Sequence, residues 1–151
     1  MKIRSASVNE AAALTRLARA SKASWGYPEA WLREWEDELT ITPEWVRAHT
    51  VLIAERQGRL VGMVGVGEGE FGPELSHLWI APDCQGLGLG RTLVGKAREV
   101  AAVEHWPRLR ILSDPHAQPF YEHLGAVHVG DVAAPVEGAP DRTLPVLHLE
   151  I

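Results

Sequence analysis

The residues best suited to chemistry lie in a glycine-rich segment near the middle of the chain. It reads Gln85-Gly86-Leu87-Gly88-Leu89-Gly90-Arg91 and follows an apolar run, residues 75–80, that is typical of a strand. Glycines lack the Cβ atoms that would keep a ligand away from the backbone, and the first free N–H groups of a helix that begins there attract an anion. The segment therefore predicts a phosphate site, and a pyrophosphate fits such a turn.

Two well-known phosphate-binding patterns differ from this segment. The dinucleotide fingerprint has the spacing G-x-G-x-x-G, with an acidic residue about 20 residues later. Here the spacing is G-x-G-x-G, and although Glu104 lies near the required distance, Gly90-Arg91-Thr92 does not complete the pattern. The phosphate loop of nucleoside triphosphatases needs Lys-Ser or Lys-Thr after its last glycine. This chain has Arg91-Thr92 there, so that pattern is excluded. A nicotinamide-nucleotide-binding protein stays as the less favoured alternative.

The pattern that remains, Gln85-x-x-Gly88-x-Gly90, resembles the acetyl-coenzyme A signature Q/R-x-x-G-x-G/A of the GNAT superfamily of N-acetyltransferases. A second segment, A-Q-P-F-Y-E-H-L-G-A at residues 117–126, is similar to the superfamily's A-x-x-F-Y-x-x-L-G-F/A motif. The motifs stand in the right order, and the resemblance is strongest over residues 50–130. It implies an acetyl-coenzyme A-dependent enzyme that acetylates a primary amine by direct attack in a ternary complex.

The resemblance implies roles for individual residues. Backbone groups of Leu78, Trp79 and Ile80 would pair with the pantetheine arm, and one N–H there would polarise the thioester carbonyl. Tyr121 would protonate the departing thiolate, because a phenol with a pKa of about 10 keeps its proton at neutral pH. Asp114 stands where the family usually has asparagine, and it could accept a hydrogen bond from a pantetheine amide. The other implied cofactor-binding residues are Gln85, Gly86, Leu87, Gly88, Leu89, Gly90, Arg91, Ala117 and Phe120.

The sequence leaves the general base open. Glu74 and His77 lie on the strand that leads to the presumed thioester, and regular alternation sends them to opposite faces, so at most one faces the amine. The pKa of histidine suits a base, although an isolated strand histidine is more often a hydrogen-bonded core residue. Some family members carry a glutamate on the strand before the second motif, but Leu109 stands there, so proton removal through water is a third option.

Aromatic residues before the motifs are candidates for the acceptor site. Trp25 and Tyr27 lie in an expected loop, where the superfamily's variable segment covers the acceptor. Such rings suit an amine or an aromatic acceptor through cation–π contact or stacking. Trp31 and Trp35 are one helical turn apart and are better explained as a buried stripe. Arg142 could reach an acidic substrate group, but an exposed strand arginine is the simpler interpretation.

These residues need an α/β (α+β) scaffold to position them, a mixed central β-sheet flanked by helices. The expected order is β-α-α-β-β-β-α-β-α-β-β, as the resemblance also implies. Pro28 begins a second helix that extends to about Glu38, and residues 91–104 form the helix after the glycines. The segment 56–59 joins two strands as a hairpin in which Gly58 takes positive φ.

Composition narrows the classes of function. The chain has 151 residues, enough for one domain with a proper core, here residues 1–151. A net charge of −5 argues against a nucleic-acid surface, and the histidines show no metal-ligand spacing with the single cysteine, Cys84. One cysteine forms no internal disulfide, and because the first residues lack a long apolar run we expect neither a signal peptide nor a membrane span. We therefore expect a soluble, cytoplasmic enzyme without a metal or a membrane partner.

Two questions stay open at the level of sequence. The same fold could serve as a non-catalytic acyl-coenzyme A-binding or sensor domain, because fold does not fix function. The sequence also does not identify the acceptor amine, which could be a small molecule or a protein amine, and does not distinguish a monomer from a homodimer.

Overall fold

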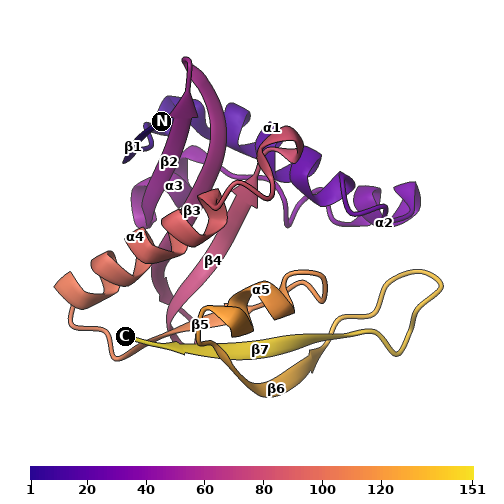
Figure 1. Ribbon diagram of the computed structural model, residues 1–151. Coiled ribbons are helices and arrows are strands. Elements are labelled where there is room, and N and C mark those ends of the chain that lie inside the picture. The colour runs from indigo at the N-terminus through magenta and orange to yellow at the C-terminus, as the bar shows by residue number, and fades with distance from the viewer.

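The seven strands of the chain form one sheet with the order β1-β2-β3-β4-β5-β7-β6. The computed structural model describes all of residues 1–151 (Figure 1). Neighbouring strands are antiparallel except β4 and β5, which run parallel, so the sheet is mixed as predicted. The strands are β1 (Lys2–Ser5), β2 (Thr50–Arg56), β3 (Arg59–Gly69), β4 (Gly72–Ile80), β5 (Arg108–Leu112), β6 (Val127–Ala133) and β7 (Thr143–Glu150).

Helices cover both faces of the sheet. In Figure 1, α1 and α3 lie behind the sheet, α4 and α5 lie in front of it, and α2 extends beyond its edge. A Cβ at Gly62 of β3 would lie 3.0 Å from Leu93 of α4, whereas one at Gly65 would overlap the ring of Trp45 from α3. The helices are α1 (Ala11–Ala23), α2 (Glu29–Glu34), α3 (Pro43–Ala48), α4 (Leu89–Val103) and α5 (Gln118–His123), with short 3₁₀ helices η1 (Val8–Glu10) and η2 (Pro82–Cys84).

One hydrophobic core runs through the molecule. It includes fully buried side chains from distant parts of the chain, such as Leu14 of α1, Ile53 of β2 and Leu147 of β7. Each such side chain contributes about 1.5–3 kcal/mol relative to exposure. No helix of the structure combines the length and the apolar character needed to cross a membrane.

Local expectations are met at the hairpin but not at the second helix. Gln57 (φ 52°) and Gly58 (φ 75°) both take positive φ between β2 and β3, as a type I′ turn requires. The second helix ends at Glu34 and does not extend to Glu38. The chain then continues through turns that place Trp35 and Leu39 in the core, 6% and 5% exposed.

Strands β4 and β5 diverge from a single point of contact. Glu74 and Arg110 form the one registered pair between them, and Figure 1 shows the two strands separating from there. Because β4 pairs with β3 as far as Ile80 only along its other edge, the edge that faces β5 has no strand partner from Ser76 onward. Backbone N–H and C=O groups need partners, so this edge can receive an extended ligand.

A β-bulge at Ser76 changes which side chains share a face of β4. His77 pairs with Gly65 of β3 and Glu74 pairs with Gly67, while Ser76 has no partner in the register. Since Gly65 and Gly67 are two residues apart and share a face, Glu74 and His77 also share a face. The prediction that they lie on opposite faces is wrong, because it assumed regular alternation along β4.

Candidate active site

The glycine-rich segment forms a loop that leads from β4 and η2 into the first turn of α4. Gly88 is the N-terminal cap of α4 and has φ of 80°, a left-handed conformation that residues with a Cβ rarely adopt. No atom lies within 4 Å of the position that its Cβ would occupy. The start of α4 therefore has open space beside its free N–H groups, where the helix attracts an anion.

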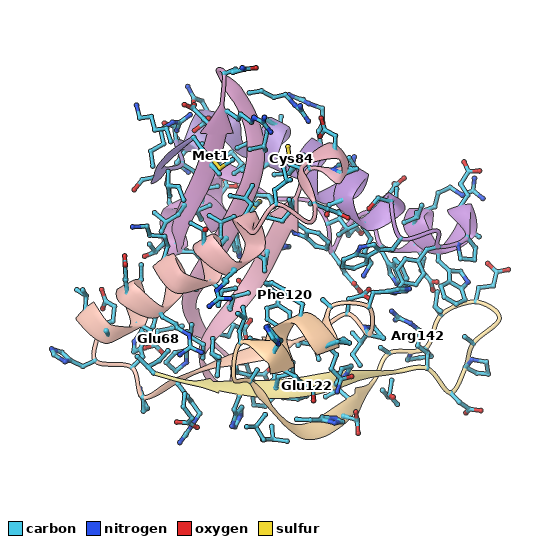
Figure 2. The ribbon with its side chains drawn as sticks, in the orientation of Figure 1. Met1, Glu68, Cys84, Phe120, Glu122 and Arg142 are labelled. Atoms are coloured by element: carbon cyan, nitrogen blue, oxygen red, sulfur yellow. The ribbon has the colours of Figure 1, made fainter.

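Gly90 is required for a different reason from the one that its sequence suggested. A Cβ at this position would lie 3.1 Å from Cζ of Phe120, so the missing Cβ makes room for a side chain of α5. Phe120, labelled in Figure 2, lies between α4 and α5. The two sequence motifs are thus in direct contact, and the missing Cβ of Gly90 allows them to pack closely.

The loop opens onto a cavity of about 390 Å³, which we call the glycine-loop cavity. This volume is in the range of about 300–1,000 Å³ that is usual for ligand pockets. Three of the predicted cofactor-binding residues, Trp79, Leu87 and Asp114, do not line it, and Leu87 is 62% exposed. The lining consists of Ser21, Trp25, Leu78, Ile80, Cys84, Gln85, Gly86, Gly88, Leu89, Gly90, Arg91, His116, Ala117, Phe120 and Tyr121.

Tyr121 forms part of the wall of this cavity. Its side chain is buried, and its hydroxyl has no hydrogen-bond partner in the chain. Burial, together with the nearby charge of Asp114, raises the pKa of Tyr121 above its usual value. The phenol is therefore protonated at neutral pH and can donate its proton to a ligand in the cavity, as a general acid must.

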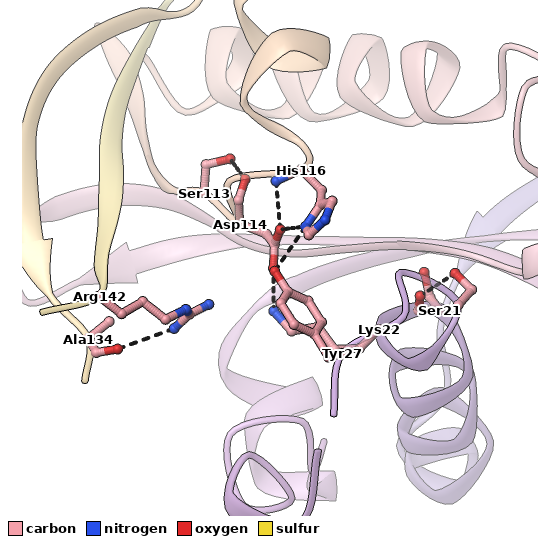
Figure 3. A network of polar contacts seen from close by, with 9 residues as sticks. Ser21, Lys22, Tyr27, Ser113, Asp114, His116, Ala134 and Arg142 are labelled. Atoms are coloured by element: carbon pink, nitrogen blue, oxygen red, sulfur yellow. Dashed lines mark hydrogen bonds and ion pairs between the residues drawn. The ribbon is translucent and has the colours of Figure 1, made fainter. Parts of the chain in front are cut away.

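Asp114 is the centre of a polar network that connects α1 with the loop before α5 (Figure 3). One carboxylate oxygen accepts from Lys22 Nζ at 2.6 Å and from the Tyr27 hydroxyl at 2.8 Å. The other accepts from the His116 backbone N–H at 2.8 Å and lies 3.0 Å from its Nδ1. Burial raises the pKa of Asp114, but the ion pair with Lys22 and the hydrogen bonds outweigh it and hold the pKa below its usual value.

This network changes the interpretation of Asp114. The predicted contact with pantetheine requires a carboxylate oxygen that is free and faces the glycine-loop cavity. Instead, both oxygens already have two partners, and Asp114 lines a different cavity. The position of Asp114 favours a structural role, which the sequence could not reveal because Lys22 is 92 residues away.

Another cavity, of about 230 Å³, adjoins the network, and we call it the second cavity. Alternate residues of β4 divide between the two cavities: Leu78 and Ile80 line the glycine-loop cavity, while His77 and Trp79 line the second. The unpaired edge of β4 therefore lies between them. The lining comprises Lys22, Trp35, Glu38, Leu39, Ser76, His77, Trp79, Leu112, Asp114, Arg142 and Leu144.

Several residues of the second cavity were missed by sequence reasoning. Glu38, Ser76, Leu112 and Leu144 come from four separate segments, and none of them carries a motif. Only Glu38 could have been suspected from the sequence, because it lies three residues after Trp35, a spacing that places two side chains on the same face of a helix. Arg142 was considered as a contact for an acidic substrate group, and its side chain does reach this cavity.

His77 is poorly suited to act as the base. Trp79 Nε1–H donates to His77 Nδ1 at 2.8 Å, so the basic lone pair of the neutral ring is already occupied. Burial, and then repulsion from His49, lowers the pKa of His77 to about 4. The ring is therefore neutral at pH 7 and a weak acceptor of a further proton.

Glu74 lies away from both cavities. Its carboxylate is 3.7 Å from the Arg110 guanidinium, at the point where β4 and β5 meet. Neither candidate base faces the glycine-loop cavity, and His77 alone faces the second.

The two aromatic residues of the predicted acceptor loop differ in position: Trp25 faces a cavity and Tyr27 does not. Trp25 stacks on His116, with ring centroids 5.5 Å apart, and lines the glycine-loop cavity. Tyr27 lines neither cavity, and its ring packs edge-on against Trp35 at 4.9 Å. The position of Tyr27 favours a structural role, whereas Trp35, predicted only as buried, also faces the second cavity.

The combination of a glycine loop, two diverging parallel strands and a buried tyrosine has a counterpart among known protein families. Residues 14–126 match the model of the acetyltransferase (GNAT) family. The chain belongs to the GNAT acetyltransferase family. The match includes both sequence motifs, so the predicted family is confirmed, and this GNAT protein is an acyltransferase.

Solved structures share the fold of this GNAT protein at low sequence identity. A GCN5-related N-acetyltransferase from Rhodopseudomonas palustris is 20% identical with a TM-score of 0.81, over 99% of this chain and 95% of that chain. PaiA N-acetyltransferase from Thermoplasma acidophilum, in complex with coenzyme A, is 17% identical with a TM-score of 0.75, over 99% and 98%. A ribosomal-protein-alanine N-acetyltransferase from Brucella melitensis is 21% identical with a TM-score of 0.73, over 100% of both chains. No curated protein sequence matches the chain.

Proposed function

We propose that this GNAT-family protein uses acetyl-coenzyme A to acetylate a primary amine, which attacks the thioester directly in a ternary complex. The observation that carries the proposal is the unpaired edge of β4, from Ser76 to Ile80, which lies between two cavities. A donor bound along this edge would have its pyrophosphate at the start of α4. Its thioester would then be accessible to an amine in the second cavity.

The residues of the glycine-loop cavity fit such a donor. Gly86 and Gly88 have no neighbouring atoms within 4 Å of their Cβ positions, which leaves room for a pyrophosphate beside the N–H groups of α4. Pantetheine carries amides that can pair with the β4 edge as an added strand would. The complex of PaiA with coenzyme A supports this use of the shared fold. When bound, acetyl-coenzyme A supplies the acetyl group as a thioester.

The chain would contribute two groups to the transfer. A backbone N–H of the β4 edge donates to the thioester carbonyl oxygen and stabilises the negative charge that develops there. The amine nitrogen bonds to the carbonyl carbon, the carbon–sulfur bond breaks, and the thiolate takes the hydroxyl proton of Tyr121, which the proton released by the amine restores through water. The Tyr121 hydroxyl suits this role because no group of the chain competes for its proton.

We assign removal of the amine proton to water. The lone pair of His77 accepts from Trp79, and Glu74 is paired with Arg110 away from both cavities. A covalent acetyl-cysteine intermediate is not supported either. Cys84 is buried, and its Sγ donates to a carboxylate oxygen of Asp83 at 3.7 Å, with no histidine hydrogen-bonded to the thiol to activate it.

The test combines binding with turnover. Purified protein is incubated with acetyl-coenzyme A and a panel of primary amines, and free thiol and N-acetylated product are measured together. We expect both in equal amounts, and we expect acetyl-coenzyme A, but not NAD, to raise the melting temperature. Stabilisation without transfer to any amine would identify a binding or sensor domain. No stabilisation at all would refute the assignment of the donor site.

A further inference from the structure

The second cavity contains an arginine that has no acidic partner in the chain. Arg142 is half-buried, its Cζ lies 4.8 Å from the centroid of the Trp35 ring, and its Nη1 donates to the Ala134 carbonyl at 3.3 Å. No carboxylate lies within 4 Å of its guanidinium. Figure 3 shows the guanidinium directed toward Tyr27 and Lys22. A guanidinium has five N–H donors, and most of these remain for a ligand.

The other charged residues of the cavity do not neutralise Arg142. Lys22 and Asp114 form an ion pair with each other at 2.6 Å. Glu38 is exposed and forms no ion pair. The cavity therefore presents one cation that the chain leaves unpaired, Arg142, and one unpaired carboxylate, Glu38, which repels a ligand carrying more than one negative charge.

The lining of the cavity includes a hydroxyl without a partner. The Oγ atom of Ser76 is buried and makes no hydrogen bond, and it belongs to the bulge beside the unpaired edge of β4. A buried polar atom of this kind calls for a ligand or a water as its partner. The lining is about half apolar, and its apolar residues are Trp35, Leu39, Trp79, Leu112 and Leu144.

We infer that the acceptor is a free α-amino acid with an apolar or aromatic side chain. Its carboxylate binds the fork of Arg142, its amine lies toward Ser76 and the β4 edge, and its side chain packs on the aromatic walls. The volume of about 230 Å³ suits one small molecule. A phosphate dianion is disfavoured by the unpaired carboxylate of Glu38. This inference rests on the proposed acetyltransferase function and names its substrate class.

The test compares two acceptors that differ only in the carboxylate. L-Phenylalanine and L-phenylalaninamide share the amine and the side chain, so each variant's kcat/KM is compared with wild type for the same acceptor. Arg142→Gln should lower kcat/KM for phenylalanine on the order of 10- to 100-fold, as expected for loss of hydrogen bonds to a charged group. The value for the amide should stay within roughly threefold, because the amide offers no negative charge to Arg142.

Two further variants serve as controls. Arg142→Lys keeps the charge but loses the fork, and should give an intermediate loss for phenylalanine. Arg108→Gln removes an exposed arginine that pairs with Glu150, and should change neither acceptor. Calorimetric titration of phenylalanine into the coenzyme A complex measures the same contact without turnover, and Arg142→Gln should weaken that binding while its melting temperature stays near wild type.

The outcomes separate this inference from the proposal on which it rests. Equal losses for phenylalanine and its amide in Arg142→Gln would overturn the carboxylate contact. Acetylation of other amines but of no apolar amino acid would overturn the substrate class and leave the acetyltransferase function intact. Absence of transfer to every amine tested would refute both together.

Discussion

Replacement of Asp114 by alanine is expected to destabilise the fold, mainly through the charge that it leaves behind. The side chains of Lys22 and Asp114 are only 12% and 7% exposed. Without the carboxylate, the ammonium would remain among the rings of Trp25, Tyr27 and Trp35, at 5.7, 5.2 and 4.6 Å from their centroids. Removal of one partner of a buried ion pair costs about 3–5 kcal/mol.

Unfolding in urea, followed by tryptophan fluorescence, measures this loss directly. About 3–5 kcal/mol corresponds to a fall in melting temperature of roughly 6–20 °C for a chain of this length. The double variant Lys22→Met with Asp114→Ala removes the uncompensated charge and should recover at least about 1 kcal/mol of the loss. A loss in Asp114→Ala of less than about 1 kcal/mol at pH 7 would mean that the pair behaves like an exposed one. A double variant no more stable than the single one would refute Lys22 as the source.

The pH dependence gives an independent check on the same pair. The ion pair holds the pKa of Asp114 below that of an unfolded aspartate, which is about 3.9. The unfolded chain therefore binds a proton first as the pH falls, and the stabilisation present above about pH 4 is lost as the pH falls through the folded pKa. The difference in stability between wild type and Asp114→Ala should be constant from pH 5 to 7 and should shrink below pH 4.

Three other changes test the remaining parts of the site. Tyr121→Phe should lower kcat at least about tenfold with little change in acetyl-coenzyme A binding, as steady-state kinetics and thermal shift would measure; full activity from pH 6 to 9 would show a structural tyrosine. Gly88→Glu should abolish the rise in melting temperature that acetyl-coenzyme A causes, whereas Gly95→Glu, further along α4, should retain it. His77→Gln should keep most of the activity, and it should remove a loss of stability of up to about 3 kcal/mol that wild type shows between pH 6.5 and 4, because the unfolded histidine protonates before the buried one. A large loss of kcat in His77→Gln at unchanged stability would contradict the assignment of proton removal to water.

The parts of the site that could be predicted are those whose residues lie close together in the sequence. Glycines between a strand and a helix have few structural solutions, so the loop around Gly88 follows from a local pattern. The position of Tyr121 follows from the resemblance of residues 117–126 to the second GNAT motif. The order of strands and helices, which also follows from local patterns, is confirmed, and the segment Thr42-Pro43-Glu44-Trp45 predicts the start of the further short helix α3.

The parts that could not be predicted depend on contacts between distant residues. A bulge at Ser76 has no residue signature, yet it moves Glu74 and His77 onto one face. Nothing near Asp114 in sequence shows that Lys22 and Tyr27 will occupy its oxygens. The second cavity likewise exists only when segments from α1 to β7 are folded together.

The divergence of β4 and β5 has a consequence for the cooperativity of the molecule. Strands β1–β4 and β5–β7 share one registered backbone pair, so a donor lying along β4 would act as the strand that links the two halves. We expect the amide hydrogens of Leu78 and Ile80, which have no strand partner on the side of β5 in the free protein, to exchange readily there and to be protected in the complex. Departure of coenzyme A would then require this ladder to open. The rate of product release and the local stability of the sheet would be governed by the same event.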